Sequence, residues 1–187
     1  MTLLGLLRHA DTAWSAEGRI QGQRDISLLA GAHCALPEAC KGMRIVTSPL
    51  ARCVETAALL GAPRAEREPR LGEMSWGAWE GRRLSELRAE LGETMRENEA
   101  RGWDFRPAGG ETPREVLSRV RGWLAEVAAQ DIATLAVTHR GVIRAILTAA
   151  IGWDLRGASP AKLDWSAVQL FRLEADGTPA LERLNVK

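Results

Sequence analysis

The sequence of 187 residues is poor in the features that disulfide-stabilised, zinc-binding and membrane-spanning proteins need. Its three cysteines, Cys34, Cys40 and Cys53, are odd in number and lack CxxC spacing, so we expect neither a disulfide framework nor a metal site. No apolar run is long enough to span a bilayer, and the first residues lack a basic leader, which predicts no signal peptide. Together these absences predict a cytoplasmic protein with reduced thiols and no membrane partner.

A strong excess of one charge is also missing. The formal net charge is +1, with acidic and basic residues interspersed, which argues against nucleic acid as a partner. Apolar residues make up 45% of the chain and charged residues 26%, which is ordinary for a globular protein. This length allows a single domain, residues 1–187, to bury a core without disulfides or metals.

Short apolar runs alternate with helical patterns along the chain. Strands are predicted at 3–7, 44–47, 65–68, 132–137, 168–173 and 181–186. Helices are predicted at 50–60, 84–95, 112–127 and 142–151, the third starting with a capping box at Thr112-Pro113-Arg114-Glu115. This alternation predicts an α/β fold, a three-layer sandwich with a mostly parallel central sheet flanked by helices.

Two of the only three histidines stand directly after predicted strands. His9 follows Arg8 at the end of the first strand, and His139 ends another strand far downstream. In α/β sheets, ligands bind beyond the carboxyl ends of the strands. Phosphoryl transfer requires a positioned nucleophile, cationic groups around the oxygens and an acid for the leaving oxygen. An imidazole beside a guanidinium at this edge predicts phosphoryl chemistry.

Arg52 and Glu73 are candidates for the remaining parts of such a site. Arg52 starts the helix after the second strand, and Glu73 lies in a Gly- and Trp-rich segment that could place a carboxyl over a pocket. The alternatives are structural: both histidines hydrogen-bonded at strand ends, Arg8 and Arg52 in ion pairs, and Glu73 an ordinary loop carboxylate.

Arg8-His9-Ala10-Asp11-Thr12 resembles the Arg-His-Gly-Glu-Thr motif of the histidine phosphatase superfamily, whose fold is phosphoglycerate-mutase-like. The resemblance covers nearly the whole chain and continues in the family's order through Ser48-Pro49 with Arg52 and Thr56, Leu71-x-Glu73, Gly77-x-Trp79-Glu80-Gly81, Gly109-Gly110-Glu111-Thr112 and Thr138-His139-Arg140-Gly141-Val142.

The resemblance implies a role for each matching residue. His9 would attack phosphorus and become a phosphohistidine. Glu73 would protonate the leaving alkoxide and then deprotonate the hydrolytic water. Arg8, Arg52 and His139 would hold the phosphoryl oxygens, with His139 protonated by the anion that it faces. No metal or other cofactor is implied, because cationic side chains would stabilise the charge.

Four positions qualify the resemblance. Ala10 replaces the usual Gly and requires a backbone conformation that tolerates a Cβ. Ser15 stands where the family often has a phosphate-binding Asn, and Arg140 replaces a frequent Gly, so it either adds charge or points to solvent. Gln21 lies in a segment that resembles the family's substrate-side loop, although a plain turn explains it too. Ser15, Gln21 and Arg140 are predicted substrate contacts.

Within the family, the resemblance favours hydrolysis of a small phosphomonoester, a phosphorylated metabolite. Similar mutases are expected to be longer, and segment 77–81 resembles the phosphatase branch. Residues 74–112 are predicted to form a lid or specificity insertion. Segments 138–147 and 181–185 resemble α-ribazole phosphatases, with broad specificity as the other choice. A phosphoglycerate-type mutase and a non-catalytic phosphate-binding module are alternatives, and a homodimer is left open.

Overall fold

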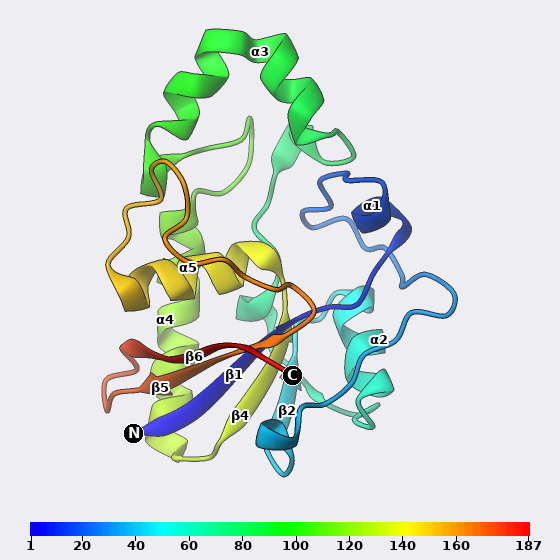
Figure 1. Cartoon of the computed structure of the whole chain (residues 1–187), viewed down its shortest axis with the longest axis vertical. Coiled ribbons are helices and arrows are strands. Elements are labelled where there is room, and N and C mark those ends of the chain that lie inside the picture. The colour runs from blue at the N-terminus through cyan, green and yellow to red at the C-terminus, as the bar shows by residue number, and fades with distance from the viewer.

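The computed structural model describes residues 1–187 and has a central sheet with helices on both of its faces (Figure 1). The strands are β1 (Thr2–Arg8), β2 (Arg44–Thr47), β3 (Glu66–Arg67), β4 (Thr134–Thr138), β5 (Val168–Leu173) and β6 (Pro179–Val186). The α-helices are α1 (Ala13–Ala16), α2 (Ala51–Leu59), α3 (Leu84–Glu99), α4 (Pro113–Gln130) and α5 (Arg140–Ile151). Short 3₁₀ turns are η1 (Glu38–Cys40), η2 (Pro69–Leu71), η3 (Gly77–Trp79) and η4 (Gly102–Asp104). No helix is both long and apolar enough to cross a membrane.

The six-stranded sheet has the order β3-β2-β4-β1-β5-β6. The first four strands are parallel, whereas β5 is antiparallel to β1 and forms a hairpin with β6. This arrangement confirms the predicted α/β sandwich with a mostly parallel sheet. It also confirms the two late strands joined by a turn at 176–177.

Both faces of β1 are covered, which explains its unbroken apolar run. Leu4 and Leu6 belong to the large core that α4 and α5 form on one face of the sheet. Leu7 packs in a second cluster on the other face, and α2 covers that face through Cys53 and Ala57. Neither face is left to solvent, so the carboxyl ends of the strands remain for a ligand.

Two local predictions are wrong, one at the start of a strand and one inside a helix. Ile132 lies outside β4 and is 47% exposed, because α4 ends at a left-handed Asp131 and the chain enters the sheet only at Thr134. The predicted helix from 84 to 95 is broken at Gly92, which has φ 51° and ψ −117°. The capping box of α4 is confirmed, since the Thr112 side chain accepts from Glu115 N at 3.1 Å.

Helix α3 stands away from the sheet, beyond the carboxyl ends of its strands (Figure 1). Its buried residues Leu87 and Met95 pack with Trp79 in a small cluster separate from the main core, lined by Trp76 and Phe105. The aromatic rings of Trp76 and Phe105 meet edge to face, with centroids 5.6 Å apart. Segment 74–112 thus has an apolar cluster of its own.

The register of three adjacent strands determines which residues meet at the edge of the sheet. Arg8 pairs with Thr138, so His9 and His139 follow neighbouring strands at the same level. Thr47 pairs with Val137, which brings Ser48 to the other side of His139. A further backbone bond of 3.0 Å from His9 N to the Thr138 carbonyl continues the ladder past the end of β1.

Candidate active site

The His9 imidazole is held in one tautomer. Its Nδ1 lies 2.7 Å from the Ala10 carbonyl, which can only accept, so Nδ1 carries the proton and the Nε2 lone pair is free. Only 3% of His9 is exposed, and burial, followed by the nearby Arg8 charge, lowers its pKa to about 3. The ring is therefore neutral at neutral pH, as a nucleophile must be. Ala10 keeps a negative φ, so its Cβ is tolerated there.

The His139 ring lies next to His9, with 5.3 Å between the ring centroids. Arg52 Nε donates to His139 Nδ1 at 3.3 Å, and because a guanidinium cannot accept, the His139 proton sits on Nε2. That Nε2–H donates to Ser48 Oγ at 2.8 Å. Burial, and then the Arg52 charge, hold the His139 pKa well below its ordinary value. Without an anion His139 is neutral, which limits the expected protonation to an anion-bound state.

Arg8 and Arg52 are both buried but are held differently. Arg8 Nη1 lies 3.5 Å from the exposed Asp11 carboxylate, whereas its buried Nε has no hydrogen-bond acceptor. Arg52 has no carboxylate partner, and it donates to the carbonyls of Gly22 and Arg24, at 2.7 Å each. Burial, followed by the Arg140 charge, lowers the Arg8 pKa to about 10. Backbone carbonyls, and not an ion pair, therefore hold the buried Arg52 guanidinium in position.

Glu73 reaches the same site from the segment after η2. Its Oε1 accepts from Met74 N at 2.8 Å and from Gly141 N at 3.0 Å. Burial raises the Glu73 pKa, and these N–H groups and Arg52 only partly oppose that effect. A Cβ at Gly141 would overlap Glu73 Oε1, so a larger residue there would displace this carboxyl. The position suits a carboxyl that alternates between acid and base.

Arg119 and Glu111 hold the segment that carries Glu73, a role that the sequence did not reveal. Arg119 on α4 donates to the carbonyls of Arg70 and Gly72, the latter at 2.7 Å, and reaches that of Glu73 at 3.3 Å. Glu111 pairs with Arg119 Nε at 3.0 Å and accepts from Ser75 N at 2.8 Å. Glu111 thus serves this clamp, and no local pattern in the sequence distinguishes Arg119 from the other arginines of its helix.

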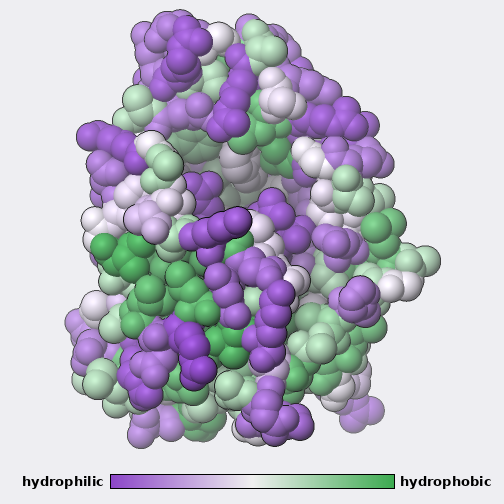
Figure 2. Space-filling view, in the orientation of Figure 1, coloured by the Kyte–Doolittle hydropathy of each residue, from purple (hydrophilic) through white to green (hydrophobic).

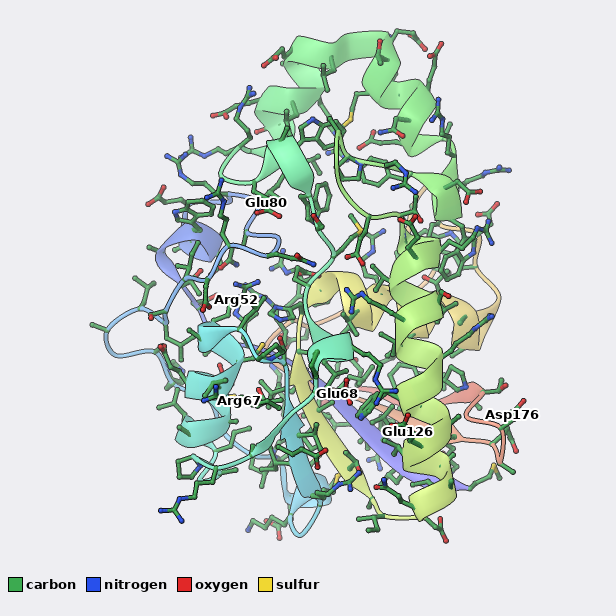
Figure 3. All side chains as sticks on the ribbon, turned by 180° about the vertical axis from the view of Figure 1, so that it is seen from behind. Arg52, Arg67, Glu68, Glu80, Glu126 and Asp176 are labelled. Atoms are coloured by element: carbon green, nitrogen blue, oxygen red, sulfur yellow. The ribbon has the colours of Figure 1, made fainter.

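Glu80 ties the loop around Arg52 to the segment that follows Glu73. Its Oε1 accepts from Gln23 N at 3.0 Å and from Trp76 N at 3.2 Å. Figure 3 shows Glu80 on the same side of the molecule as Arg52, between α2 and the α3 region. A Cβ at Gly22, which has φ +52°, would collide with the Glu80 carboxylate, so this loop depends on that glycine.

The remaining predicted contacts lie around this centre. The Ser15 hydroxyl bonds within α1, where it accepts from Thr12 N and donates to Asp11 Oδ1, each at 3.0 Å. Gln21 Oε1 accepts from the Thr12 hydroxyl at 2.7 Å, which leaves its amide NH₂ free. Arg140 is exposed, with its guanidinium 4.9 Å from the Trp165 ring centroid.

Figure 2 shows a hollow in the surface below the α3 region.

The model of the histidine phosphatase superfamily (branch 1) matches residues 4–187. The chain belongs to this superfamily. A probable 2-carboxy-D-arabinitol-1-phosphatase of Arabidopsis thaliana is 30% identical over 79% of this chain, which spans about a third (33%) of that protein. A 2,3-bisphosphoglycerate-dependent phosphoglycerate mutase of Azorhizobium caulinodans is 28% identical over 97% of each chain.

Solved structures share the fold of this superfamily member. A phosphoserine phosphatase of Entamoeba histolytica superposes with a TM-score of 0.78 at 24% identity, covering 100% of this chain and 98% of that one. A mycobacterial glucosyl-3-phosphoglycerate phosphatase superposes with a TM-score of 0.76 at 24% identity over 100% of both chains. The 200 aligned positions include 97% of this 187-residue chain, so the Azorhizobium mutase has insertions relative to this chain, in agreement with the expectation that similar mutases are longer.

The neutral state of His9 predicts how stability depends on pH. The folded-state pKa lies far below that of the unfolded chain, so the unfolded state binds more protons below about pH 6.5 and stability falls with acid. Between pH 7 and pH 5, we expect His9 to account for a loss of about 2 kcal/mol in the free energy of unfolding. Urea titrations of wild type and His9→Gln in phosphate-free buffer measure it.

The exposed His33 provides the control for this comparison. His33→Gln should keep the wild-type pH dependence, whereas His9→Gln should reduce it by the share of His9 and leave the share of the buried His139. Equal slopes for wild type and His9→Gln would contradict the neutral buried imidazole.

Proposed function

We propose that this protein is a metal-independent phosphatase that hydrolyses a small phosphomonoester through a phosphohistidine on His9. The observation that carries this proposal is the neutral His9, whose Nδ1 is held by the Ala10 carbonyl and whose ring lies 5.3 Å from that of the neutral His139. The charge of Arg8 acts on His9, and the carboxyl of Glu73, with its raised pKa, acts on Arg8. A nucleophile, an anion-binding wall and an acid are the three parts that phosphoryl transfer requires.

In the first step, His9 Nε2 attacks phosphorus and the bond from phosphorus to the ester oxygen breaks. The proton on Glu73 passes to the departing alkoxide, which leaves as an alcohol. The phosphorylated ring keeps its Nδ1–H and gains positive charge, and the Ala10 carbonyl 2.7 Å away stabilises that charge.

In the second step, the Glu73 carboxylate takes a proton from a water molecule as its oxygen attacks phosphorus. The bond from phosphorus to His9 breaks, inorganic phosphate leaves, and both residues return to their starting states. Burial supports the double role, because it raises the pKa of Glu73 above that of an ordinary carboxyl.

Arg8, Arg52 and His139 would stabilise the phosphoryl oxygens. The Arg8 Nε has no acceptor in the protein and is free to donate to an oxygen. His139 Nε2–H would donate to the phosphoryl group instead of to Ser48 Oγ. The negative charge of the bound anion would also raise the His139 pKa. Arg52 would add its charge and its N–H groups that the loop carbonyls do not use. Ser15 and Gln21 stay predicted contacts.

The residues outside the catalytic centre would control how the substrate enters the site and which substrate binds. We place residues 1–187 in one domain and assign segment 74–112 the role of a lid with the small core of Trp79, Leu87 and Met95. The substrate would be a phosphorylated metabolite. α-Ribazole phosphate is one candidate, and a broad range of phosphomonoesters is the other possibility.

A phosphoglycerate-type mutase is the second candidate, since the Azorhizobium mutase aligns over 97% of both chains. The two reactions share the phosphohistidine and differ in whether water or a second hydroxyl takes the phosphoryl group. With 3-phosphoglycerate, a phosphatase releases phosphate faster than it forms 2-phosphoglycerate, and a mutase does the reverse. Following both products in one time course separates them.

The nucleophile can be trapped directly. Wild type quenched with ³²P-labelled substrate should carry an acid-labile, base-stable label, and His9→Ala should carry none and lose activity by about 10³-fold or more. EDTA should leave the wild-type activity unchanged. Label on His9→Ala would overturn the assignment, and a wild type that binds phosphate but turns over no ester would indicate a binding module.

Replacement of the acid should depend on the leaving group. Glu73→Gln removes the proton donor, so turnover of an alkyl phosphate should fall by about 10²-fold or more. p-Nitrophenyl phosphate needs little protonation of its leaving group and should lose less. Equal losses on both esters would reject Glu73 as the general acid.

The Arg119 clamp predicts a milder form of the same effect. Arg119→Gln frees the carbonyls of the 70–73 segment, so Glu73 should be misplaced and kcat for alkyl phosphates should fall about 10-fold with a smaller change in KM. Arg121→Gln, at an exposed position of the same helix, is the control. Losses that do not depend on the leaving group would assign Arg119 a purely structural role.

A further inference from the structure

We infer that Arg140 selects phosphomonoesters whose alcohol carries a second anionic group, a carboxylate or a phosphate. This inference rests on the proposed phosphatase function and names its substrate class. The juxtaposition that carries it is an unpaired guanidinium that lies over the Trp165 ring, on the residue that directly follows His139.

The backbone places Arg140 between two residues of the centre. It is the first residue of α5, directly after His139, and the next N–H, from Gly141, binds Glu73 Oε1 at 3.0 Å. The Arg140 side chain therefore begins close to the Glu73 carboxyl, which would protonate the leaving alkoxide. Figure 1 shows the segment from α5 to β5 running alongside this helix.

Trp165, from that segment, restricts the Arg140 side chain. The guanidinium carbon lies 4.9 Å from the centroid of the Trp165 ring, and Trp165 itself packs against the main core. A contact with an aromatic ring does not use up the N–H groups of a guanidinium, so those of Arg140 can still bind an anion. The contact with Trp165 thus places the charge before a ligand arrives.

No group of the protein neutralises this charge by direct contact. Many arginines of the chain pair with a carboxylate within 4.0 Å, as Arg119 does with Glu111, but Arg140 forms no ion pair and no hydrogen bond. It also lies close enough to Arg8 to lower the pKa of that residue. Two like charges near one another are unfavourable without a ligand, and a substrate with two anionic groups would offset both.

A second arginine on the same helix serves as the internal comparison. Arg144, one turn after Arg140, stacks on Trp153 with 5.7 Å to the ring centroid, and it has no residue of the centre beside it in the chain. The two positions have similar exposure and similar aromatic partners. They differ in their distance along α5 from His139, so only Arg140 should influence substrate choice.

The test compares esters that differ in one anionic group. 3-Phosphoglycerate and glycerol 3-phosphate differ by a carboxylate in place of a hydroxymethyl group, and fructose 1,6-bisphosphate and fructose 6-phosphate differ by a phosphate. For wild type, Arg140→Gln, Arg140→Lys and Arg144→Gln, the measured quantity is the ratio of kcat/KM within each pair, from phosphate release.

Arg140→Gln should lower at least one of the two ratios by about 10- to 100-fold, and the pair affected identifies carboxylate or phosphate as the second anion. Arg140→Lys should recover part of the ratio, and Arg144→Gln should leave it as in wild type. Unchanged ratios in Arg140→Gln, or an equal fall in Arg144→Gln, would overturn the inference. A wild type that releases no phosphate from any ester would instead overturn the proposed function.

Discussion

The parallel pairing of β1 with β4 is the constraint on which the site depends. Because Arg8 and Thr138 are partners in this ladder, the two residues that follow them, His9 and His139, leave the sheet side by side. A shift of this register by one residue would turn His9 to the other face of the sheet. The apolar packing on both faces of β1 prevents such a shift, so the core and the site are specified together.

Burial at this edge has a cost that the surrounding backbone offsets. Two imidazoles and two guanidiniums lie where water scarcely reaches, and burial drives both histidines to their neutral forms. Backbone carbonyls hold Arg52, and backbone N–H groups hold Glu73. Neutral histidines, a protonatable carboxyl and fixed cations suit phosphoryl transfer, and a bound anion would restore the balance of charge.

Most of the architecture could be predicted because its causes are local. The unbroken apolar run of β1, the box that caps α4 and the turn between β5 and β6 are patterns of neighbouring residues. The errors arose at single residues with a positive φ, Gly92 inside α3 and Asp131 at the end of α4, which the apolar pattern does not reveal. Gly92 breaks α3, which packs on its own small cluster, and the chain rises from α4 before it joins the sheet at Thr134.

By itself, the sequence determined the order of the elements and the superfamily, and it supplied the residues that we propose as reactive, since these follow from spacing along the chain. Only the tertiary structure decided the state of those residues. The tautomer of His139 depends on Arg52 and Ser48, the pKa of Glu73 on burial, and the position of Glu73 on Arg119. Proton positions and pKa values depend on distances and on access to water, which residues far apart in the chain create when they fold together.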